Sequence, residues 1–469
     1  MPTNLFSSLA NAFNRVFSRP ERKSRPDYVF NVGLDFGTAF IKCIVRDVGN
    51  KAAWPLQVTL EGQKTFLIPS RVQIHNGRVS GPLDPSGSGV SISYLKMALA
   101  ATCGSATDDI WWQTVSADLK SALGDVRNEQ INALTVFLLT HVLSAVRRFV
   151  VEMRPDFGVQ KGDCCFVNMA VPVAHAESLA VQAVFHTALQ QAYHFAFDGG
   201  LPSGSMDDLL RSIDKAKVQP DTAERCALYP EVSANVQSYI RSAAARQELH
   251  LFVDVGAGTV DLSAFIYFPH PSNDRPLSYL AADVLPLGAS QIELRAALGG
   301  VATVDQFRRF KETGNAPFDI QHSVKERVRQ VASEIEAELA WGALRTLRKA
   351  RALIPTAHQP GSQFYRLQLL MGGGGSAEPL YTRGIRAALQ EVRITDPPIL
   401  PLPIPGDLIW PHGMAQRERE AAFKRLSVAY GLSFMRADLD EHRFPRDIEP
   451  LPPRKDPAPR YSAPTKDEC

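Results

Sequence analysis

An apolar stretch that runs into an Asp-x-Gly turn and a threonine occurs twice in this chain. Residues 249–253 lead into Asp-Val-Gly-Ala-Gly-Thr-Val-Asp at 254–261, and residues 29–34 lead into Asp-Phe-Gly-Thr at 35–38. Each pattern predicts a buried strand that ends in a tight turn, where glycine lets the backbone N–H groups approach a ligand. Each turn also opens one half of the chain, and each half ends on helical patterns. The sequence therefore predicts an α/β protein built by internal duplication.

A third glycine-rich turn, Gly-Gly-Gly-Gly-Ser at 372–376, follows the apolar run at 367–371. A single turn of this kind most often only reverses the chain. Three of them after strands favour a polyphosphate site, because phosphate needs N–H and hydroxyl donors. Asp254 and Asp261 would repel bare phosphate, so they favour Mg²⁺ lying between the carboxylates and a nucleotide.

These motifs, in this order, resemble those of the actin-like ATPase superfamily, and most closely the ATPase domain of the seventy-kilodalton heat-shock chaperones. Less specific similarities in other segments support this placement, and the whole resemblance covers about residues 28–440. These segments are Ile68-Pro69-Ser70, Ser91–Met97 with Lys96, Asn168–Val173, Leu287-Gly288 and Val428–Gly431. The resemblance implies an α/β, actin-like ATPase fold, with two duplicated RNase H-like α/β domains around a nucleotide cleft.

The implied organisation has four parts. They are a basic amphipathic segment at 1–26, a first ATPase lobe at 27–247 with an inserted subdomain at about 51–125, a second lobe at 248–440 with an inserted subdomain at about 291–362, and a Pro-rich, disordered tail at 441–469. Apolar periodicity predicts long helices at 130–153 and 323–349. Residues 199–219 look like an insertion with a short surface helix at 206–217, and the prolines of 397–411 predict an extended loop.

The resemblance also assigns the site. ATP would contact Gly37, Thr38, Gly256, Ala257, Gly258, Thr259, Gly372, Gly373, Gly374 and Lys311, the last within Phe310-Lys311-Glu312. Hydrated Mg²⁺ would be held by Asp35, Asp254 and Asp261. The candidates for hydrolysis are Asp254, Lys96, Asp35, Thr259 and Glu231. Lys96 would face the γ-phosphate; the alternative interpretation is a solvated surface lysine.

Two departures from the chaperone pattern bear on hydrolysis. Ala39 stands where the chaperones have a second threonine, and Tyr229 stands where they have the glutamate of a Glu-Pro motif. Plasmid-partition actins have a Pro-Glu order that resembles Pro230-Glu231, so Glu231 is the candidate substitute. We therefore expect ATP binding more firmly than fast hydrolysis.

The leading hypothesis is a slowly hydrolysing, chaperone-like nucleotide switch that lacks a substrate-binding domain and acts on an unidentified protein partner as ATP and ADP exchange. The alternatives are a filament-forming cytoskeletal or partition ATPase that self-assembles, and a nucleotide-binding pseudoenzyme. A small-molecule kinase on the same fold is the weakest hypothesis, since no sugar pocket is recognisable.

Residues 1–26 combine an apolar face with five basic residues. The apolar face holds Leu5, Phe6, Leu9, Phe13, Val16 and Phe17, and the basic residues are Arg15, Arg19, Arg22, Lys23 and Arg25. Three interpretations stay open: contact with a membrane surface through residues 1–19, docking on a partner, and packing on the protein itself.

Composition limits the remaining classes. The net charge of +2 gives no reason to expect nucleic-acid binding. The six cysteines form no Cys-x-x-Cys pair, which favours free thiols in a reducing compartment. No run of eighteen apolar residues and no secretory segment are found. The expected location is cytoplasmic, or peripheral at the inner membrane face.

Overall fold

The computed structural model describes most of the chain. The described residues are 25–84, 89–104, 110–171, 178–200, 204–216, 218–246, 248–267, 277–314, 320–353, 366–394, 397–439 and 442–443. The predicted helix at 1–19 and the segment up to residue 24 lie outside this set, as does the tail beyond residue 443.

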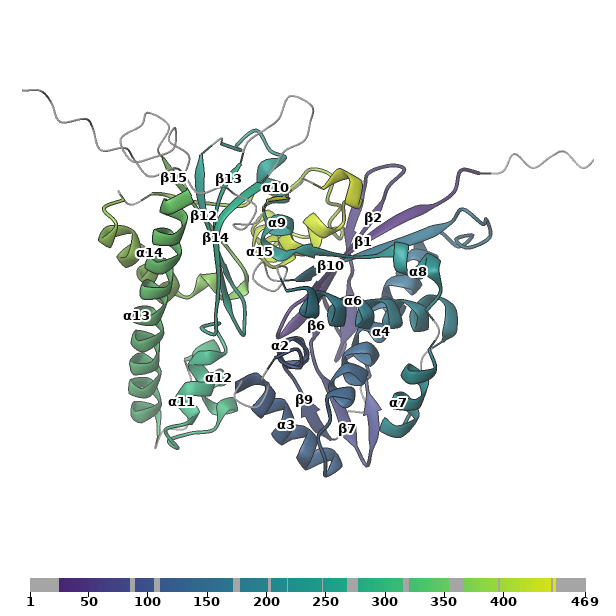
Figure 1. Ribbon diagram of the computed structural model, residues 1–469, viewed down its shortest axis with the longest axis horizontal. Helices are drawn as coiled ribbons and strands as arrows, with labels where there is room; N and C mark the ends of the chain where they lie inside the picture. The colour runs from purple at the N-terminus through teal and green to yellow at the C-terminus, as the bar shows by residue number, and fades with distance from the viewer. Residues whose placement is uncertain are drawn as a thin grey trace, which may run out of the picture.

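Two six-stranded sheets form the centres of two lobes (Figure 1). The first has the order β11 (Cys226–Pro230), β10 (Cys164–Val171), β1 (Val29–Phe36), β2 (Phe40–Asp47), β3 (Ala53–Pro55), with β6 (Ile68–Pro69) also paired to β2. The second has the order β16 (Ile399–Leu400), β15 (Leu367–Gly372), β12 (Leu249–Val255), β13 (Val260–Tyr267), β14 (Leu277–Leu285), β17 (His442–Arg443). The chain is therefore an α/β protein, as predicted.

The two sheets repeat one plan. In each, an antiparallel hairpin (β1–β2 or β12–β13) is extended by a third antiparallel strand on one side. On the other side, two later strands run parallel to the first strand of the hairpin and to each other. The internal duplication predicted from the sequence is thus present in the strand order.

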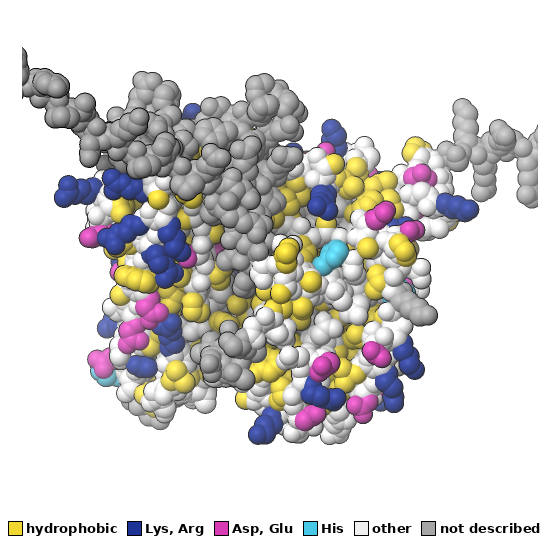
Figure 2. All heavy atoms as spheres, viewed as in Figure 1, with side chains coloured by type: hydrophobic (Ala, Val, Ile, Leu, Met, Phe, Trp, Pro, Cys, Tyr) yellow, Lys and Arg dark blue, Asp and Glu magenta, His cyan; other side chains and the backbone are white. Residues whose placement is uncertain are grey.

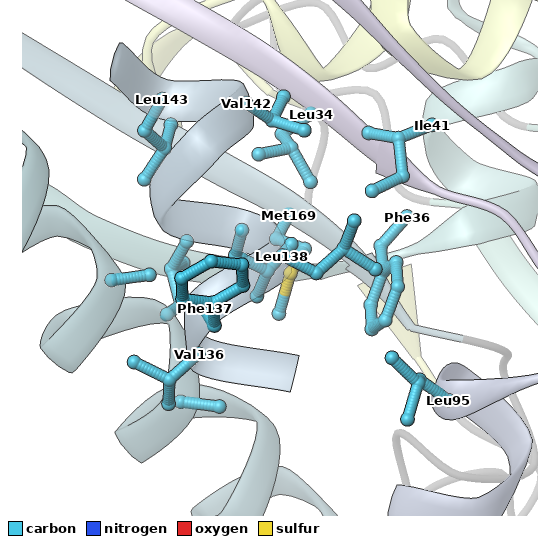
Figure 3. Close-up of a cluster of buried hydrophobic side chains, with 14 of the residues drawn as sticks. Leu34, Phe36, Ile41, Leu95, Val136, Phe137, Leu138, Val142, Leu143 and Met169 are labelled. Atoms are coloured by element: carbon cyan, nitrogen blue, oxygen red, sulfur yellow. The ribbon is translucent and has the colours of Figure 1, made fainter. Parts of the chain in front are cut away.

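Helices cover both faces of the first sheet. The main ones on one face are α2 (Leu95–Ala101), α4 (Asn128–Met153) and α6 (Leu179–His194), and α4 packs its apolar side against β1 and β2 (Figure 3). Flanking elements of this lobe are α3 (Ile110–Leu123), α7 (Met206–Lys215), α8 (Pro220–Arg225), β4 (Val58–Leu60), β5 (Gln63–Thr65), β7 (Val72–His75), β8 (Arg78–Ser80) and β9 (Val90–Ile92). The helix predicted at 206–217 is α7, which buries Met206, Leu209 and Ile213 in the lobe core instead of lying wholly on the surface.

The second sheet is covered in the same way. On one face lie α11 (Gln291–Ala297), α12 (Val304–Thr313), α13 (Gln321–Leu353) and α14 (Pro379–Glu391), and on the other lie α9 (Glu231–Asn235) and α10 (Gln237–Ile240). The helix α13 is the one predicted at 323–349, and its buried stripe includes Val331, Ile335 and Leu339. Residues 397–411 form the predicted loop except for the short strand β16.

One helix, α15 (Gln416–Leu432), covers the remaining face of the first sheet and contacts α9. Its close approach requires glycine at two places. A Cβ at Gly33 would clash with the carbonyl oxygen of Ala429, and a Cβ at Gly431 would clash with that of Ala234. The end of α15 is held by the side-chain amide of Asn168, which donates to the carbonyl of Leu432 at 2.8 Å.

The packed chain extends further than predicted at its C-terminal end. The strand β17 pairs with β14 through Leu277 and His442, which lies at the start of the segment predicted as a Pro-rich, disordered tail. Backbone hydrogen bonding, which hydropathy does not register, accounts for the difference.

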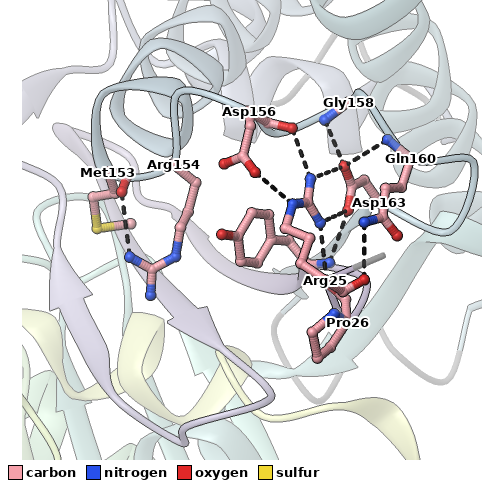
Figure 4. Close-up of polar contacts among 9 residues, drawn as sticks. Arg25, Pro26, Met153, Arg154, Asp156, Gly158, Gln160 and Asp163 are labelled. Carbon is pink, nitrogen blue, oxygen red and sulfur yellow. Dashed lines mark hydrogen bonds and ion pairs between the residues drawn. The ribbon is translucent and has the colours of Figure 1, made fainter. Parts of the chain in front are cut away.

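At the other end, Arg25 is the first described residue and is held by two aspartates (Figure 4). Its guanidinium donates to Asp163 at 2.7 and 2.8 Å and to Asp156 at 2.5 Å, and it lies over the ring of Tyr28. The hydrogen bond from Arg25 is the main reason that the pKa of Asp163 is lowered. The point where residues 1–24 join the first lobe is therefore fixed.

One helix in the described part of the chain, α4, is long and apolar enough to cross a membrane by length and composition. Of its most apolar stretch, 67% is buried within the protein. A core helix passes the same criteria, and α4 packs in the core of the first lobe. The five cysteines within the described residues are free thiols.

Positive charge is unevenly spread over the surface. Figure 2 shows Lys and Arg side chains gathered over the region of α13 and α14. The last third of α13 carries Arg345, Arg348, Lys349 and Arg351. Arg345 and Lys349 pair with Asp283, and cations are favourable near a helix C-terminus, so this face has a structural explanation.

Candidate functional site

A cavity of about 520 Å³ lies where the two hairpin turns meet. The first turn contributes Asp35, Gly37 and Thr38, and the second contributes Asp254, Gly256, Ala257, Thr259 and Asp261. The turn after β15 contributes Gly373, Gly374 and Gly375, and the cavity is also lined by Lys42, Lys96, Glu231, Asn235, Glu293, Arg308, Lys311 and Arg425. Three segments far apart in the sequence, each predicted from its glycines, thus share one cavity.

Glycine allows the two hairpins to come together. Gly258 was predicted as an ATP contact, but it does not line the cavity. A Cβ at this position would lie 2.9 Å from the side chain of Thr38. The second turn is also braced from behind, because Ala289 N–H donates to the carbonyl of Gly256 at 2.9 Å and Ser290 N–H donates to that of Ala257 at 2.8 Å. With its carbonyls occupied, the turn presents N–H groups to the cavity.

The available N–H groups are not those of Gly37 and Gly256. The N–H of Gly37 donates to the carbonyl of Asp35 and that of Gly256 to the carbonyl of Thr259, so both close their own turns. In the described part of the chain, the N–H groups of Thr38, Ala39, Ala257 and Gly258 donate to no other group. Thr38, Ala39 and Ala257 also line the cavity, so an anion there would find available donors from both hairpins.

Four of the carboxylates that line the cavity lie close together, and two lysines pair with two of them. Asp35, Asp254 and Asp261 are 1%, 5% and 6% exposed, and Glu231 joins them. The Lys42 ammonium pairs with Asp35, and Lys96 Nζ lies 3.0 Å from Glu231 Oε2. Because these four carboxylates lie close enough to raise one another's pKa and only two lysines pair with them, a bound cation would relieve their repulsion.

The pKa values of the three aspartates respond to their burial and to this crowding of carboxylates. Burial, followed by the charges of neighbouring carboxylates, raises the pKa of Asp254 well above its usual value. Burial and then Glu231 raise the pKa of Asp261 to about 7, and burial also raises the pKa of Asp35.

Lys96 is charged and buried. Burial opposes its charged form, but Glu231, Asp35 and Asp261 together outweigh burial and raise its pKa. Only 5% of the residue is exposed, so the alternative interpretation of Lys96 as a solvated surface lysine is wrong.

The donor set fits a hydrated divalent cation. Asp35 Oδ1 and Asp261 Oδ1 are buried and have no hydrogen-bond partner among the described residues. In that same part of the chain, no group of three His, Cys, Asp or Glu side chains is arranged to enclose a metal ion. Mg²⁺ keeps most of its waters and takes one or two carboxylates, so scattered, unpaired oxygens suit it better than a protein cage.

Glu231, and not Tyr229, supplies the carboxylate at the end of the first half. Tyr229 is buried on β11, packs with Ala170, Ala234 and Val428, and does not itself line the cavity. The strand ends at Pro230, whose φ of −60° starts α9, and Glu231 is the first residue of that helix. The Pro-Glu order therefore brings a carboxylate to the cavity that the Tyr229 position does not.

The glycines after β15 divide into two roles. Gly373, Gly374 and Gly375 line the cavity, whereas Gly372, predicted as a ligand contact, does not. A Cβ at Gly372 would lie 2.9 Å from the ring of Phe252 and 3.0 Å from Asn235, so this glycine makes room for the core. Gly373 has a φ of 80°, which side chains rarely adopt.

Lys311 lines the cavity but is engaged by its own lobe. Its ammonium lies 2.5 Å from Glu293 Oε2 and donates to the carbonyl of Ala289 at 2.9 Å. Phe310 packs against the second core. The side chain of Glu312, named with them as a base contact, lies outside the described residues.

Sequence reasoning missed many polar residues of this cavity, among them Lys42, Asn235, Glu293, Arg308 and Arg425. Lys42 could have been found, because a hairpin turn after Asp35 brings the two residues opposite each other in register. Asn235 donates to Asp254 Oδ2 at 2.9 Å from α9, a contact that only the tertiary structure creates.

Comparison with known proteins adds no relative. No protein-family model matches the chain, and no curated protein matches it significantly.

Proposed function

We propose that this chain is an ATP-binding, slowly hydrolysing nucleotide switch with an actin-like ATPase fold of two duplicated RNase H-like domains. One observation carries the proposal. Two sheets with the same strand order each deliver an Asp-x-Gly hairpin turn, with available N–H groups, to a single cavity. A duplicated pair of turns facing each other fits a ligand with a chain of phosphates, which both turns contact at once.

The cavity suits such a ligand in size and charge. Its volume of about 520 Å³ lies within the range of roughly 300–1,000 Å³ of small-molecule sites. The N–H groups of Thr38, Ala39 and Ala257 would bind phosphate oxygens, and Lys42 and Lys96 would balance their charge. Gly373 and Gly374 leave room for the nucleoside beside Arg425.

Asp35, Asp254 and Asp261 would hold hydrated Mg²⁺, consistent with the unpaired oxygens of Asp35 and Asp261. When bound, this ion neutralises the charge of the polyphosphate and of the transferring group. Its positive charge would also offset the repulsion among the clustered carboxylates.

Hydrolysis needs a group that orients a water molecule and takes up its proton. The raised pKa of Asp254 makes it the candidate base, and Asn235 holds its Oδ2 in place. Lys96 would stabilise charge on the γ-phosphate, and Glu231 holds Lys96 in turn. A nucleotide bound by both lobes would favour their closed arrangement, and a partner protein would detect that change.

Calorimetry with ATP and Mg²⁺ on the purified protein tests this proposal. We expect saturable binding of one nucleotide, weakened when Mg²⁺ is removed by chelation. Absence of binding would contradict the proposal.

Phosphate release by wild type and Asp254→Asn separates hydrolysis from binding. The expected result is a loss of roughly 10²-fold or more with nucleotide still bound. Asp214→Asn, an exposed aspartate on α7, is the matched control and should not change the rate. Equal rates for wild type and Asp254→Asn would indicate a contaminating ATPase.

A further inference from the structure

The short helix α9 is held on two of its sides. Figure 1 shows it in the region between the two sheets. Val232 and Val236 pack with Phe265 of the second sheet. On another side, Ala234 packs with residues of the first sheet and of α15. The contact with α15 is at backbone distance, because a Cβ at Gly431 would lie 1.8 Å from the carbonyl oxygen of Ala234. The helix therefore cannot turn about its axis without disturbing the packing on both sides.

The remaining side of α9 carries two polar residues to the cavity. Residues four apart lie on the same side of a helix, so Glu231 and Asn235 share one face, and both line the cavity. Lys96 Nζ, from α2 of the first lobe, lies 3.0 Å from Glu231 Oε2. Asn235 is fully buried, and its Nδ2 donates to Oδ2 of Asp254, on β12 of the second lobe, at 2.9 Å. One turn of a firmly packed helix thus contacts both the cavity lysine and the candidate base.

Two neighbours restrict the carboxylate of Asp254. Its Oδ2 accepts the hydrogen bond from Asn235, and its Oδ1 lies beside Gly373, where a Cβ would come within 2.3 Å of it. Gly372 leaves room for the amide of Asn235, since a Cβ there would lie 3.0 Å from Asn235 Nδ2. Within the described part of the chain, Asn235 is the residue that donates a hydrogen bond to this carboxylate, and it donates to Oδ2. Oδ1 is therefore the oxygen that is left to bind a water molecule in the cavity.

We propose that Asn235 is a positioning residue for hydrolysis: its amide holds Asp254 by Oδ2, so that Oδ1 faces the water that attacks the γ-phosphate. This inference rests on the proposed function. In the step, the water oxygen forms a bond to the γ-phosphorus, and the bond from that phosphorus to the bridging oxygen breaks, with its electrons remaining on ADP. The proton released by the water passes to Asp254 Oδ1. Asn235 contacts neither water nor nucleotide and acts by fixing the direction of the base.

Crystal structures of ligand-free wild type, Asn235→Leu and Asn235→Ala test the positioning without any nucleotide. Leucine keeps the branched shape of asparagine and removes the donor, and alanine removes the whole amide. We expect the Asp254 carboxylate to leave its wild-type orientation in both variants, while the backbone of the hairpin stays in place. A carboxylate that keeps its orientation in both variants would overturn the inference, whether or not the protein binds ATP.

Single-turnover hydrolysis of ATP with Mg²⁺, measured beside calorimetry on the same proteins, gives the second test. Asn235→Ala should hydrolyse ATP roughly 10- to 100-fold more slowly, as expected for a lost hydrogen bond to a carboxylate, with its affinity for ATP unchanged. Adding Asn235→Ala to Asp254→Asn should cause no further loss of rate, because Asn235 acts through that carboxylate.

Asn168→Ala is the matched control for loss of a buried amide. Asn168 is 3% exposed and donates to the carbonyls of Leu432 and Phe434, which Asn31 also binds, so the variant should fold and hydrolyse ATP as wild type does. A wild-type rate in Asn235→Ala, or a further loss in the double variant, would overturn the inference and leave the proposed function intact. A wild type that binds no ATP would instead overturn the proposed function, and the crystal structures would still decide whether Asn235 positions Asp254.

Discussion

At the residue scale, the two cavity lysines have different partners and are expected to have different roles. Lys42 pairs with Asp35 on the first hairpin, whereas Lys96 reaches the cavity from α2 and pairs with Glu231. Lys96→Met should therefore slow hydrolysis by roughly 10²-fold, since it removes a charge beside the transferring group, while Lys42 preserves most of the affinity.

Single-turnover hydrolysis and calorimetry on the same Lys96→Met protein check this expectation. Lys42→Met combined with Lys96→Met should abolish binding. Loss of binding in Lys96→Met alone, with an unchanged thermal unfolding curve, would show that the roles in binding and hydrolysis are not divided between the two lysines.

A second residue, His250, makes stability depend on pH. It is fully buried, with its ring stacked on Phe265 at 4.8 Å and its Nε2 3.2 Å from the Tyr239 hydroxyl. Burial lowers its pKa to about 4, so the folded protein resists protonation that the unfolded chain accepts near pH 6.5. Stability from neutral His250 is present above pH 6.5 and is lost as pH falls towards 4, by about 3 kcal/mol in total.

Urea unfolding at several pH values between 7.5 and 4 measures this loss. His250→Phe should flatten the acid limb of the stability curve by about that amount. His322→Gln, on an exposed histidine with 85% of its side chain accessible, should leave the curve unchanged. An equal acid limb in wild type and His250→Phe would assign the loss to other groups.

At the element scale, the close approach of the two hairpin turns depends on the absence of a side chain at Gly258. Gly258→Ala would place a Cβ 2.9 Å from the Thr38 methyl group and push the turns apart. The strands of each hairpin keep their own hydrogen bonds, so the fold should survive. We expect the affinity for ATP to fall by roughly 10-fold or more, because the N–H donors of the two turns no longer fit one ligand.

Calorimetry on three variants separates this effect from a general loss of stability. Thr38→Ser added to Gly258→Ala removes the methyl group and should recover part of the affinity. Gly406→Ala has open space around its Cβ and should bind as wild type does. Unchanged affinity in Gly258→Ala would mean that the hairpins do not act on one ligand together.

Elements with a long apolar period could be predicted from the sequence, whereas contacts between distant elements could not. The helix predicted at 130–153 is α4, and the helix predicted at 323–349 is α13. Glycine turns pointed to the cavity because their chemistry is local. Arg308 and Asn235 gave no local signal, because each becomes a cavity residue only through the packing of α12 and α9.

At the scale of the whole molecule, one helix links the two lobes, and the ligand cavity lies where the hairpin turns of both lobes meet. The helix α15 packs on β1 of the first lobe and contacts α9 and β15, which makes it the structural link between the sheets. Gly33 and Gly431 allow the backbone of α15 to lie directly against β1 and α9. Motion of one lobe relative to the other is therefore expected to occur about α15, with the cavity on the side that opens and closes.

Small-angle scattering with and without ATP and Mg²⁺ tests that motion. We expect a smaller radius of gyration with the nucleotide, because phosphate bound by both hairpins favours the closed lobes. Asp214→Asn, at the exposed aspartate on α7, should match wild type. An ATP-dependent rise in mass, with the protein recovered in the pellet, would instead favour the filament-forming alternative. A scattering curve unaffected by saturating nucleotide would contradict the switch, since a ligand that binds both arrangements equally cannot shift their balance.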